Sequence, residues 1–253
     1  MKLRRISAML AALCVPFAVQ TASAEKIIVG SECTYPPFEY VNDGKIEGYD
    51  IDIMNAIGKE AGFEPEFHNM PFDSILPAIM TNQIDVGASG FDITEERKKK
   101  VDFAGPYHFP YISVVIREAD KDKLKTKDDL KDKRLCVQIG TTGAEAAEKL
   151  TKDIGYFNAS PDAFMELRTG GCVGVINDHA TNQYFLKNGG KDGGYLEMPG
   201  VSLGENAEGF GIMVNKSNTA LRDRIQAGLQ KIKENGEYRK LRDKWFADGA
   251  TAK

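Results

Sequence analysis

The sequence is poor in the residues that metal sites and membrane-spanning segments require. Its 253 residues include three histidines, four cysteines and one tryptophan, and the cysteines and histidines do not have the spacing of a zinc motif. After residue 19, no apolar run approaches the roughly 20 residues of a membrane-spanning helix. No cofactor fingerprint is present either. We therefore expect no metal site, no cofactor and no transmembrane helix beyond the N-terminal segment.

The first 24 residues have the pattern of a secretory signal peptide. The basic stretch MKLRR precedes an apolar run and then the small residues Ala22, Ser23 and Ala24, which is the order of regions in such signals. We expect cleavage after Ala24 and a periplasmic product. Cys14 is not expected to carry a lipid anchor, because Leu13 is a poor small-residue neighbour and more apolar sequence follows.

Basic residues are not in excess, which argues against a nucleic-acid partner. Without residues 1–24 the chain has 229 residues (253 minus 24). Its 30 basic and 37 acidic side chains give a net charge of −7. A surface that binds phosphate backbones needs the opposite balance. The length suffices for one large core or two smaller ones.

Three cysteines follow the signal segment: Cys33, Cys136 and Cys172. Cys136 and Cys172 lie in apolar, strand-like runs, so they can pair if those strands are neighbours. An oxidising compartment permits a disulfide, but two buried thiols are equally compatible with the sequence.

Strand-like runs alternate with helical patterns along the chain. KIIVG, EPEFHNM and QIDVGAS predict buried strands, and Asp50 is the expected N-cap of the first helix. Asn42-Asp43-Gly44 predicts a hairpin turn. Strands that alternate with helices indicate an α/β fold with mainly parallel sheets, in which ligands bind beyond the carboxyl ends of the strands.

Several polar and aromatic residues follow these predicted strands. Thr94 is placed to cap a short helix, and Arg97 offers a planar fork that suits a carboxylate. An ordinary capped helix with a solvated basic run is the alternative. Asp178, at another strand–helix junction, could face an ammonium group or simply cap its helix. The remaining candidates from the same strand ends are Glu32, Tyr35, Phe72, Ser89, Gly90, Asp92, Thr141 and Thr142.

Longer stretches carry a resemblance to a known family. They are YPPFE, GYDID, FDSILPAI, SGFDITEERKKKVDFAGPY, DLKDKRLCVQIGTTG and LRDRIQAGLQKIKENGEYRKLRDKWF. In this order, they resemble the periplasmic polar-amino-acid-binding proteins of ABC importers, which include arginine, histidine, lysine and glutamine binders. The resemblance implies a type II periplasmic-binding-protein fold with two lobes joined by two crossing strands. It places residues 25–109 and 208–253 in lobe 1 and residues 110–207 in lobe 2.

The resemblance also implies a role for each candidate residue. Arg97 would clamp the α-carboxylate of an amino acid, with the backbone N–H groups of Asp92 and Thr142. Asp178 would take the α-ammonium group from the opposite lobe, helped by the Gly90 carbonyl and the Asp92 side chain. Tyr35 and Phe72 would enclose the ligand's side chain, and its polar end would meet Glu32, Ser89 and Thr141.

The charges of these residues favour a basic ligand. Glu32, Asp92 and Asp178 outnumber Arg97, so a cationic side chain would neutralise the excess. Arginine is the favoured ligand, with glutamine or another polar amino acid as the alternative. We expect a monomer that delivers the ligand to an ABC permease.

Some dehydratases of cyclohexadienyl acids resemble the same scaffold, so an enzyme is a further alternative. It is less favoured because the near match GASGF lacks the last glycine of a nucleophile elbow. The sequence also has no nucleophile and base at motif spacing.

Overall fold

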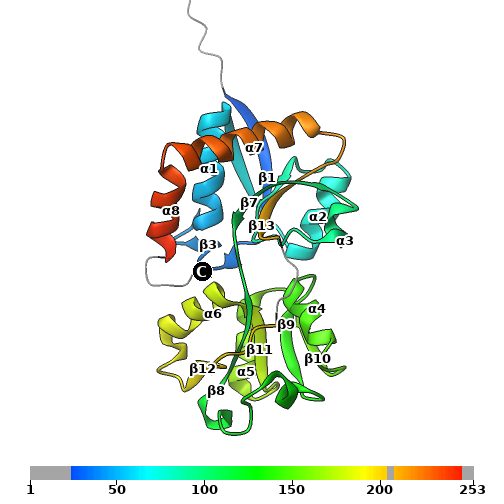
Figure 1. Cartoon of the computed structure of the whole chain (residues 1–253), viewed down its shortest axis with the longest axis vertical. Coiled ribbons are helices and arrows are strands. Elements are labelled where there is room, and N and C mark those ends of the chain that lie inside the picture. The colour runs from blue at the N-terminus through cyan, green and yellow to red at the C-terminus, as the bar shows by residue number, and fades with distance from the viewer. Residues whose placement is uncertain (1–23, 204–207, 247–253) are drawn as a thin grey trace, which may run out of the picture.

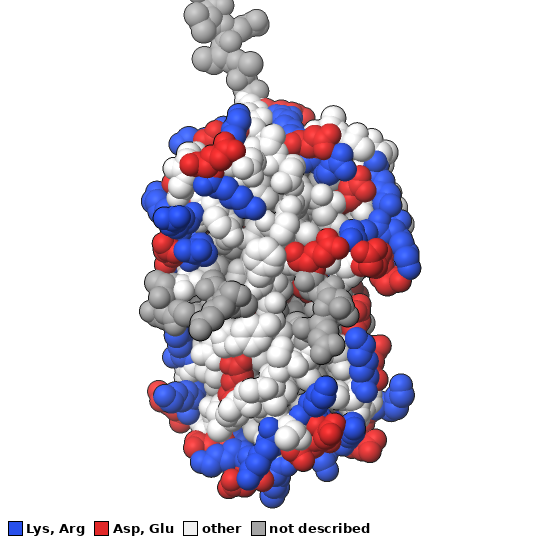
Figure 2. Space-filling model, in the orientation of Figure 1, with Lys and Arg blue, Asp and Glu red and all other residues white. Residues whose placement is uncertain are grey.

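The structure is a computed structural model that describes residues 24–203 and 208–246, so the expected signal peptide lies almost wholly outside the described residues. The chain forms two lobes, each built on a five-stranded sheet (Figure 1). In the part of the chain that is described, no helix combines the length and the apolar character needed to cross a bilayer. Acidic and basic side chains are intermixed over both lobes (Figure 2).

The sheet of lobe 1 joins strands from both ends of the chain. Its order is β5 (Phe63–Asn69), β1 (Glu25–Ser31), β6 (Val86–Gly87), β13 (Phe210–Val214) and β7 (Asp102–His108). The sheet of lobe 2 has the order β10 (Ile154–Phe157), β9 (Leu135–Gln138), β11 (Gly174–Asp178), β8 (Ile112–Arg117) and β12 (Tyr195–Glu197).

Both sheets are mixed, where mainly parallel sheets were predicted. The pairs β5–β1, β1–β6, β10–β9 and β9–β11 are parallel. The strands that connect the lobes pair antiparallel with their neighbours, as in β6–β13, β13–β7, β11–β8 and β8–β12. The reason is topological, because a chain that crosses to the second lobe and returns runs in opposite directions on the two passages.

Helices cover both faces of each sheet. They are α1 (Tyr49–Ala61), α2 (Phe72–Met80), α3 (Glu95–Lys98), α4 (Thr142–Glu148), α5 (Ser160–Thr169), α6 (His179–Phe185), α7 (Thr219–Glu234) and α8 (Glu237–Phe246). Two 3-10 segments, Glu118–Asp120 and Lys127–Leu130, and a π-helical segment, Leu186–Gly190, complete them.

Strand β1 shows how the sequence builds two cores in lobe 1. Ile27 and Val29 pack in the cluster with α1 and α7, whereas Ile28 packs in the cluster with α2. Successive side chains of a strand point to opposite faces of its sheet. The continuous apolar run is therefore what a strand needs when helices cover both faces.

A small antiparallel sheet follows β1 and contains the predicted hairpin. It consists of β2 (Thr34–Tyr35), β3 (Glu39–Asn42) and β4 (Lys45–Glu47). Asp43 and Gly44 between β3 and β4 both have positive φ, 47° and 76°, as a two-residue hairpin turn requires.

The prediction that Asp50 caps α1 is wrong. The N-cap is Gly48, and the helix begins at Tyr49. Gly48 has φ 143°, and a Cβ atom there would lie 2.0 Å from the carbonyl oxygen of Phe38. This close passage starts the helix before Asp50 and leaves the Asp50 side chain buried, with 1% of its surface exposed.

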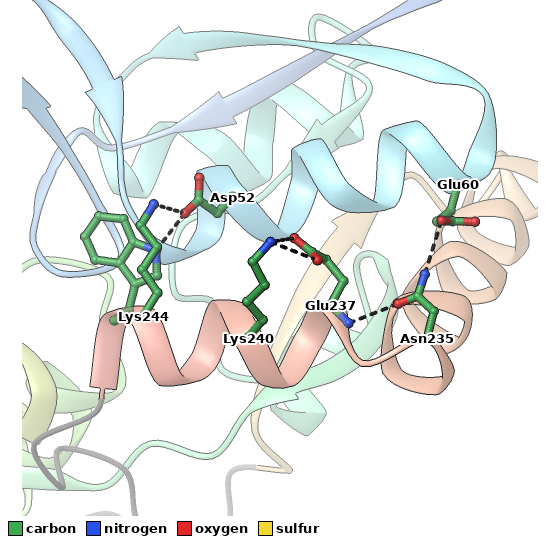
Figure 3. Close-up of polar contacts among 7 residues, drawn as sticks. Asp52, Glu60, Asn235, Glu237, Lys240 and Lys244 are labelled. Carbon is green, nitrogen blue, oxygen red and sulfur yellow. Dashed lines mark hydrogen bonds and ion pairs between the residues drawn. The ribbon is translucent and has the colours of Figure 1, made fainter.

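Helix α8 is tied to α1 by polar contacts at both of its ends (Figure 3). Asp52 accepts hydrogen bonds from Lys244 Nζ at 2.7 Å and Trp245 Nε1 at 2.8 Å. At the other end, Asn235 donates to Glu60 at 3.3 Å. The chain's only tryptophan thus serves packing and a hydrogen bond within lobe 1.

The chain crosses between the lobes from β7 to β8 and returns between β12 and β13 (Figure 1). The two passages are hydrogen-bonded to each other on the lobe 2 side, where Leu203 N–H donates to Ile112 O at 2.9 Å. On the lobe 1 side, His108 pairs with Phe210 in the sheet register. The described parts of the two passages therefore lie side by side at both lobes.

Cys136 and Cys172 form a disulfide, which settles the alternative that the sequence left open. Cys136 lies in β9, and Cys172 lies just before β11, the neighbouring strand. Cys33 is a free, buried cysteine in lobe 1.

We expect the disulfide to contribute about 3 kcal/mol to stability, because it closes a long loop of the unfolded chain. Replacing both residues (Cys136→Ala with Cys172→Ala) should lower the midpoint of urea unfolding. The variant's midpoint should not change on addition of reductant, while the native midpoint falls toward it. Cys33→Ala is the control, and it should keep the native response to reductant. A native midpoint insensitive to reductant would contradict the assignment.

Candidate functional site

A small cavity lies between the lobes, where the carboxyl ends of strands from both sheets meet. Eight of the ten residues predicted for the site line it: Tyr35, Phe72, Gly90, Asp92, Arg97, Thr141, Thr142 and Asp178. The remaining two, Glu32 and Ser89, are buried nearby but do not line the cavity. Five lining residues were not predicted: Ile112, Gln138, Gly143, Asn177 and Phe210.

Arg97 is held at the lobe 1 wall by the short helix α3. Thr94 caps this helix, as predicted, by accepting a hydrogen bond from the Arg97 N–H at 3.2 Å. The guanidinium group donates to the carbonyl oxygens of Asp92, at 2.9 Å, and Gly140, at 3.0 Å. Its carbon lies 5.3 Å from the centre of the Phe91 ring and 5.7 Å from that of Phe72. Its planar face is therefore packed on aromatic rings.

Asp92 faces the other lobe directly. Its Oδ2 accepts a hydrogen bond from the hydroxyl of Thr142 at 2.5 Å. Only 5% of its surface is exposed, and burial raises the pKa of its carboxyl group. Together with the bond from Arg97 to Gly140, this contact joins the first turn of α4 to the loop before α3.

Asp178 is at the lobe 2 wall, where β11 becomes α6. One oxygen, Oδ1, accepts the Ala180 N–H at 2.8 Å and so caps the helix. The other, Oδ2, is buried and has no hydrogen-bond partner. Burial raises the pKa of this carboxyl to about 7 from its ordinary 3.8. Asp178 therefore performs the capping role predicted as one alternative, with one oxygen left for a ligand.

Tyr35, which lines the cavity, bridges the two lobes. Its hydroxyl donates to Asn177 Oδ1 at 2.5 Å. Asn177 in turn donates to Ser160 Oγ. Phe72, another lining residue, stacks on Phe91 with 4.3 Å between ring centres. The cavity thus has aromatic as well as charged lining residues.

Glu32 and Ser89 lie behind this lining. Glu32 accepts hydrogen bonds from Thr34 Oγ1 at 2.5 Å and from Gln138 Nε2 at 3.4 Å, and burial raises the pKa of its carboxyl. Ser89 donates to Glu39 at 2.7 Å and accepts the Glu32 N–H at 3.0 Å. Thr141 caps α4 by accepting the Ala144 N–H at 3.1 Å. Gln138, which lines the cavity, thus connects Glu32 to it by a hydrogen bond.

Two of the lining residues missed by prediction had a signal in the sequence. Gln138 ends β9 and Asn177 is the penultimate residue of β11, and polar residues at the carboxyl ends of such strands commonly face ligands. Phe210 offered no such signal. It reaches the cavity because β13 inserts between β6 and β7 from the far end of the chain.

A model of the bacterial extracellular solute-binding proteins, family 3, matches residues 27–248. The chain belongs to this family. This solute-binding protein is 37% identical over 241 residues to "ABC transporter arginine-binding protein 1" of Escherichia coli (strain K12), a match that covers 94% of this chain and 97% of the relative.

Solved structures are also similar to this solute-binding protein. An ancestral arginine-binding protein bound to arginine has a TM-score of 0.81 and 37% identity, over 87% of this chain and 98% of that one. An ancestral arginine-binding protein bound to glutamine has a TM-score of 0.82 and 35% identity, over 90% and 100%. The named relatives are binding proteins, and the two-lobe fold is the one implied by the sequence resemblance.

The uncompensated burial of Asp178 predicts that this group destabilises the ligand-free protein at high pH. A folded-state pKa raised from 3.8 to about 7 means that its contribution is present at low pH and is lost as pH rises between these values. Asp178→Asn, which cannot ionise, should therefore be more stable than the native protein at pH 8, by on the order of 4 kcal/mol.

The difference between Asp178→Asn and native should shrink at pH 5, as measured by urea unfolding of dialysed protein. Asp162→Asn, at an exposed position of α5, is the matched control and should show no such trend. A variant that is less stable than native at both pH values would contradict the assignment.

Proposed function

We propose that this protein captures a basic L-amino acid, with arginine favoured, and delivers it to the permease of an ABC importer after export to the periplasm. One observation carries the proposal. A buried, unpartnered carboxylate oxygen of Asp178 and the guanidinium of Arg97 line the same cavity from opposite lobes. An α-amino acid carries an ammonium and a carboxylate group, which are the complements of these two groups.

The Arg97 end of the cavity suits the α-carboxylate. A guanidinium group can bind both oxygens of a carboxylate through parallel hydrogen bonds. In the structure it contacts backbone carbonyls of both lobes, and burial lowers its pKa. A ligand carboxylate would supply the negative partner that favours the charged form.

The opposite end suits the α-ammonium group. Asp178 provides the unpartnered oxygen, and Asp92 and Gly90 line the same cavity. A buried charge is tolerable when it is paired and hydrogen-bonded. An ammonium group would therefore favour the ionised form of Asp178 over the neutral form that burial favours.

The balance of charge supports a cationic ligand side chain. Asp92 and Asp178 line the cavity, and Glu32 lies behind Gln138. In all three, burial raises the pKa, so a nearby cation would stabilise their charged forms. The names of the similar proteins point to arginine, while the glutamine complex of an ancestral arginine-binding protein keeps glutamine as the second candidate.

Lobe closure follows from the distribution of contacts. Among the described residues, the lobes are joined by hydrogen bonds that include Thr142–Asp92, Tyr35–Asn177, Arg97–Gly140 and Gln138–Glu32. A ligand that contacts Arg97 and Asp178 together binds the closed arrangement more tightly than an open one. It would shift the population toward closure, as a monomer, and the permease could read the closed shape.

A panel of amino acids in a thermal-unfolding assay tests the ligand assignment. Arginine should raise the midpoint most, followed by lysine, histidine and glutamine, while glutamate and leucine have no effect. At a hundred times its Kd, a ligand adds about 2.7 kcal/mol to stability. A shift with glutamate or leucine but none with the basic amino acids would contradict the charge argument.

The fate of the bound molecule distinguishes a binding protein from a dehydratase. A binding protein returns the bound molecule unchanged after long incubation. A cyclohexadienyl acid recovered as a dehydrated product would favour the enzyme instead.

Arg97→Ala should reduce affinity for every α-amino acid by at least about 100-fold, or about 2.7 kcal/mol, because it leaves the ligand carboxylate without its partner. Arg97→Lys keeps the charge but not the fork, and its affinity should lie between those of Arg97→Ala and the native protein. Arg239→Ala, at an exposed position of α8, is the control. Isothermal titration measures the affinities, and native-like binding by Arg97→Ala would place the carboxylate contact elsewhere.

A further inference from the structure

Two buried carboxyl groups lie behind the ligand cavity, outside its lining. Glu39 in β3 is fully buried, and Asp50 in the first turn of α1 is 1% exposed. None of the charged groups that perturb either carboxyl in the described chain is basic. A pair of ionised carboxylates in such a place would be very costly.

Their hydrogen bonds account for only one oxygen of each group. Glu39 Oε1 accepts from the Ser89 hydroxyl at 2.7 Å. Asp50 Oδ2 accepts from Gly90 N–H at 2.7 Å and from the Tyr107 hydroxyl at 2.6 Å. Glu39 Oε2 and Asp50 Oδ1 are buried and have no donor.

A single proton on Glu39, donated to Asp50, gives a hydrogen-bond partner to both of these oxygens. Burial, and then the charge of Asp50, raise the pKa of Glu39 well above its usual range. Burial raises the pKa of Asp50 to about 6, while hydrogen bonds from Tyr107, Gly90 and Glu39 lower it. The proton therefore belongs on Glu39, and Asp50 is the carboxylate that accepts three donors.

We propose that Glu39 is a neutral hydrogen-bond donor to Asp50, and that this pair positions the Ser89–Gly90 turn for ligand binding. Each partner holds one residue of the turn, Glu39 through the Ser89 hydroxyl and Asp50 through the Gly90 N–H. Gly90 lines the cavity with φ 56°, a conformation that favours glycine. The effect on ligand affinity rests on the function proposed above, whereas the shared proton does not.

The same pair connects the turn to two further parts of the site. Ser89 Oγ accepts the Glu32 N–H at 3.0 Å, so the loop that carries Glu32 is fixed along with the turn. Tyr107 lies in β7, the strand from which the chain crosses to lobe 2. The pair also carries one negative charge instead of two, which limits the acidic excess around the cavity.

Two substitutions of Glu39 test whether its side chain acts as a neutral hydrogen-bond donor or only fills space. Glutamine can accept from Ser89 through its carbonyl and donate to Asp50 through its amide, whereas leucine can do neither. Glu39→Leu should weaken arginine binding by about tenfold or more, and Glu39→Gln should restore affinity to within about threefold of native. Equal losses in the two variants, measured by isothermal titration, would overturn the positioning role.

Infrared spectroscopy of the ligand-free protein at pH 8 detects the proton itself. The native protein should show the carbonyl-stretching band of a protonated carboxylic acid, and Glu39→Gln should lose most of its intensity. Glu64→Gln, at an exposed position of β5, is the matched control and should keep the native intensity. A native protein without the band, or a Glu39→Gln variant with the native intensity, would overturn the proposal.

The difference in stability between the native protein and Glu39→Gln should also change with pH. Glu39 remains protonated in the folded state but ionises in the unfolded chain above about 4.5, its ordinary value. Native stability is therefore lost, relative to Glu39→Gln, as pH rises from 5 to 8. The other titratable groups that face the pair are Glu32, Cys33, Tyr49 and Tyr107, and they are common to both proteins.

A stability difference between native and Glu39→Gln that does not change with pH would contradict the shared proton. If no amino acid binds the native protein, the function proposed above fails. The infrared band and the pH trend would still decide whether Glu39 holds the proton.

Discussion

A charge that leaves water must find a partner, and this constraint organises the space between the lobes. Asp178 and Arg97 approach the cavity from different sheets, and neither meets an oppositely charged side chain at hydrogen-bond distance in the described structure. The protein thus maintains two unfavourable burials that one zwitterion would relieve together. A ligand that contacts both groups would favour the arrangement that brings them together, in proportion to its differential affinity for that arrangement.

The fold delivers these charges with little dependence on long loops. Arg97 lies in the four-residue helix α3 that follows β6, Asp178 ends β11, and Thr142 begins α4 just after β9. Each position follows or ends a strand of one of the two sheets. The aromatic residues Phe72 and Phe91 then fix the orientation of the guanidinium plane. Packing therefore fixes the positions of these side chains, and their polar groups determine which ligand the cavity can bind.

Much of this was predictable, because local patterns and strand ends carry it. The hairpin at Asp43–Gly44, the cap at Thr94 and eight of the cavity's lining residues follow from the sequence and its family resemblance. Asp50 was misjudged because an acidic residue at a helix start usually caps it. Here Gly48 passes so close to Phe38 that the helix starts earlier and the carboxyl turns inward. The inward orientation of Asp50 depends on this tertiary contact, which a local sequence pattern cannot predict.

Phe210 and the antiparallel halves of the sheets share that limit, since they depend on where a distant segment inserts. The disulfide was an open alternative for a similar reason. Cys136 and Cys172 became partners only once β9 and β11 were known to be neighbours.

That covalent link has a consequence for the motion of the protein. β9 leads to Thr142 and β11 ends at Asp178, so the bridge joins the two strands that carry lobe 2's polar contacts. Their relative freedom is removed when the chain folds, before any ligand arrives. Thr142 and Asp178 therefore belong to a covalently linked part of lobe 2, which lowers the conformational entropy that ligand capture must remove there.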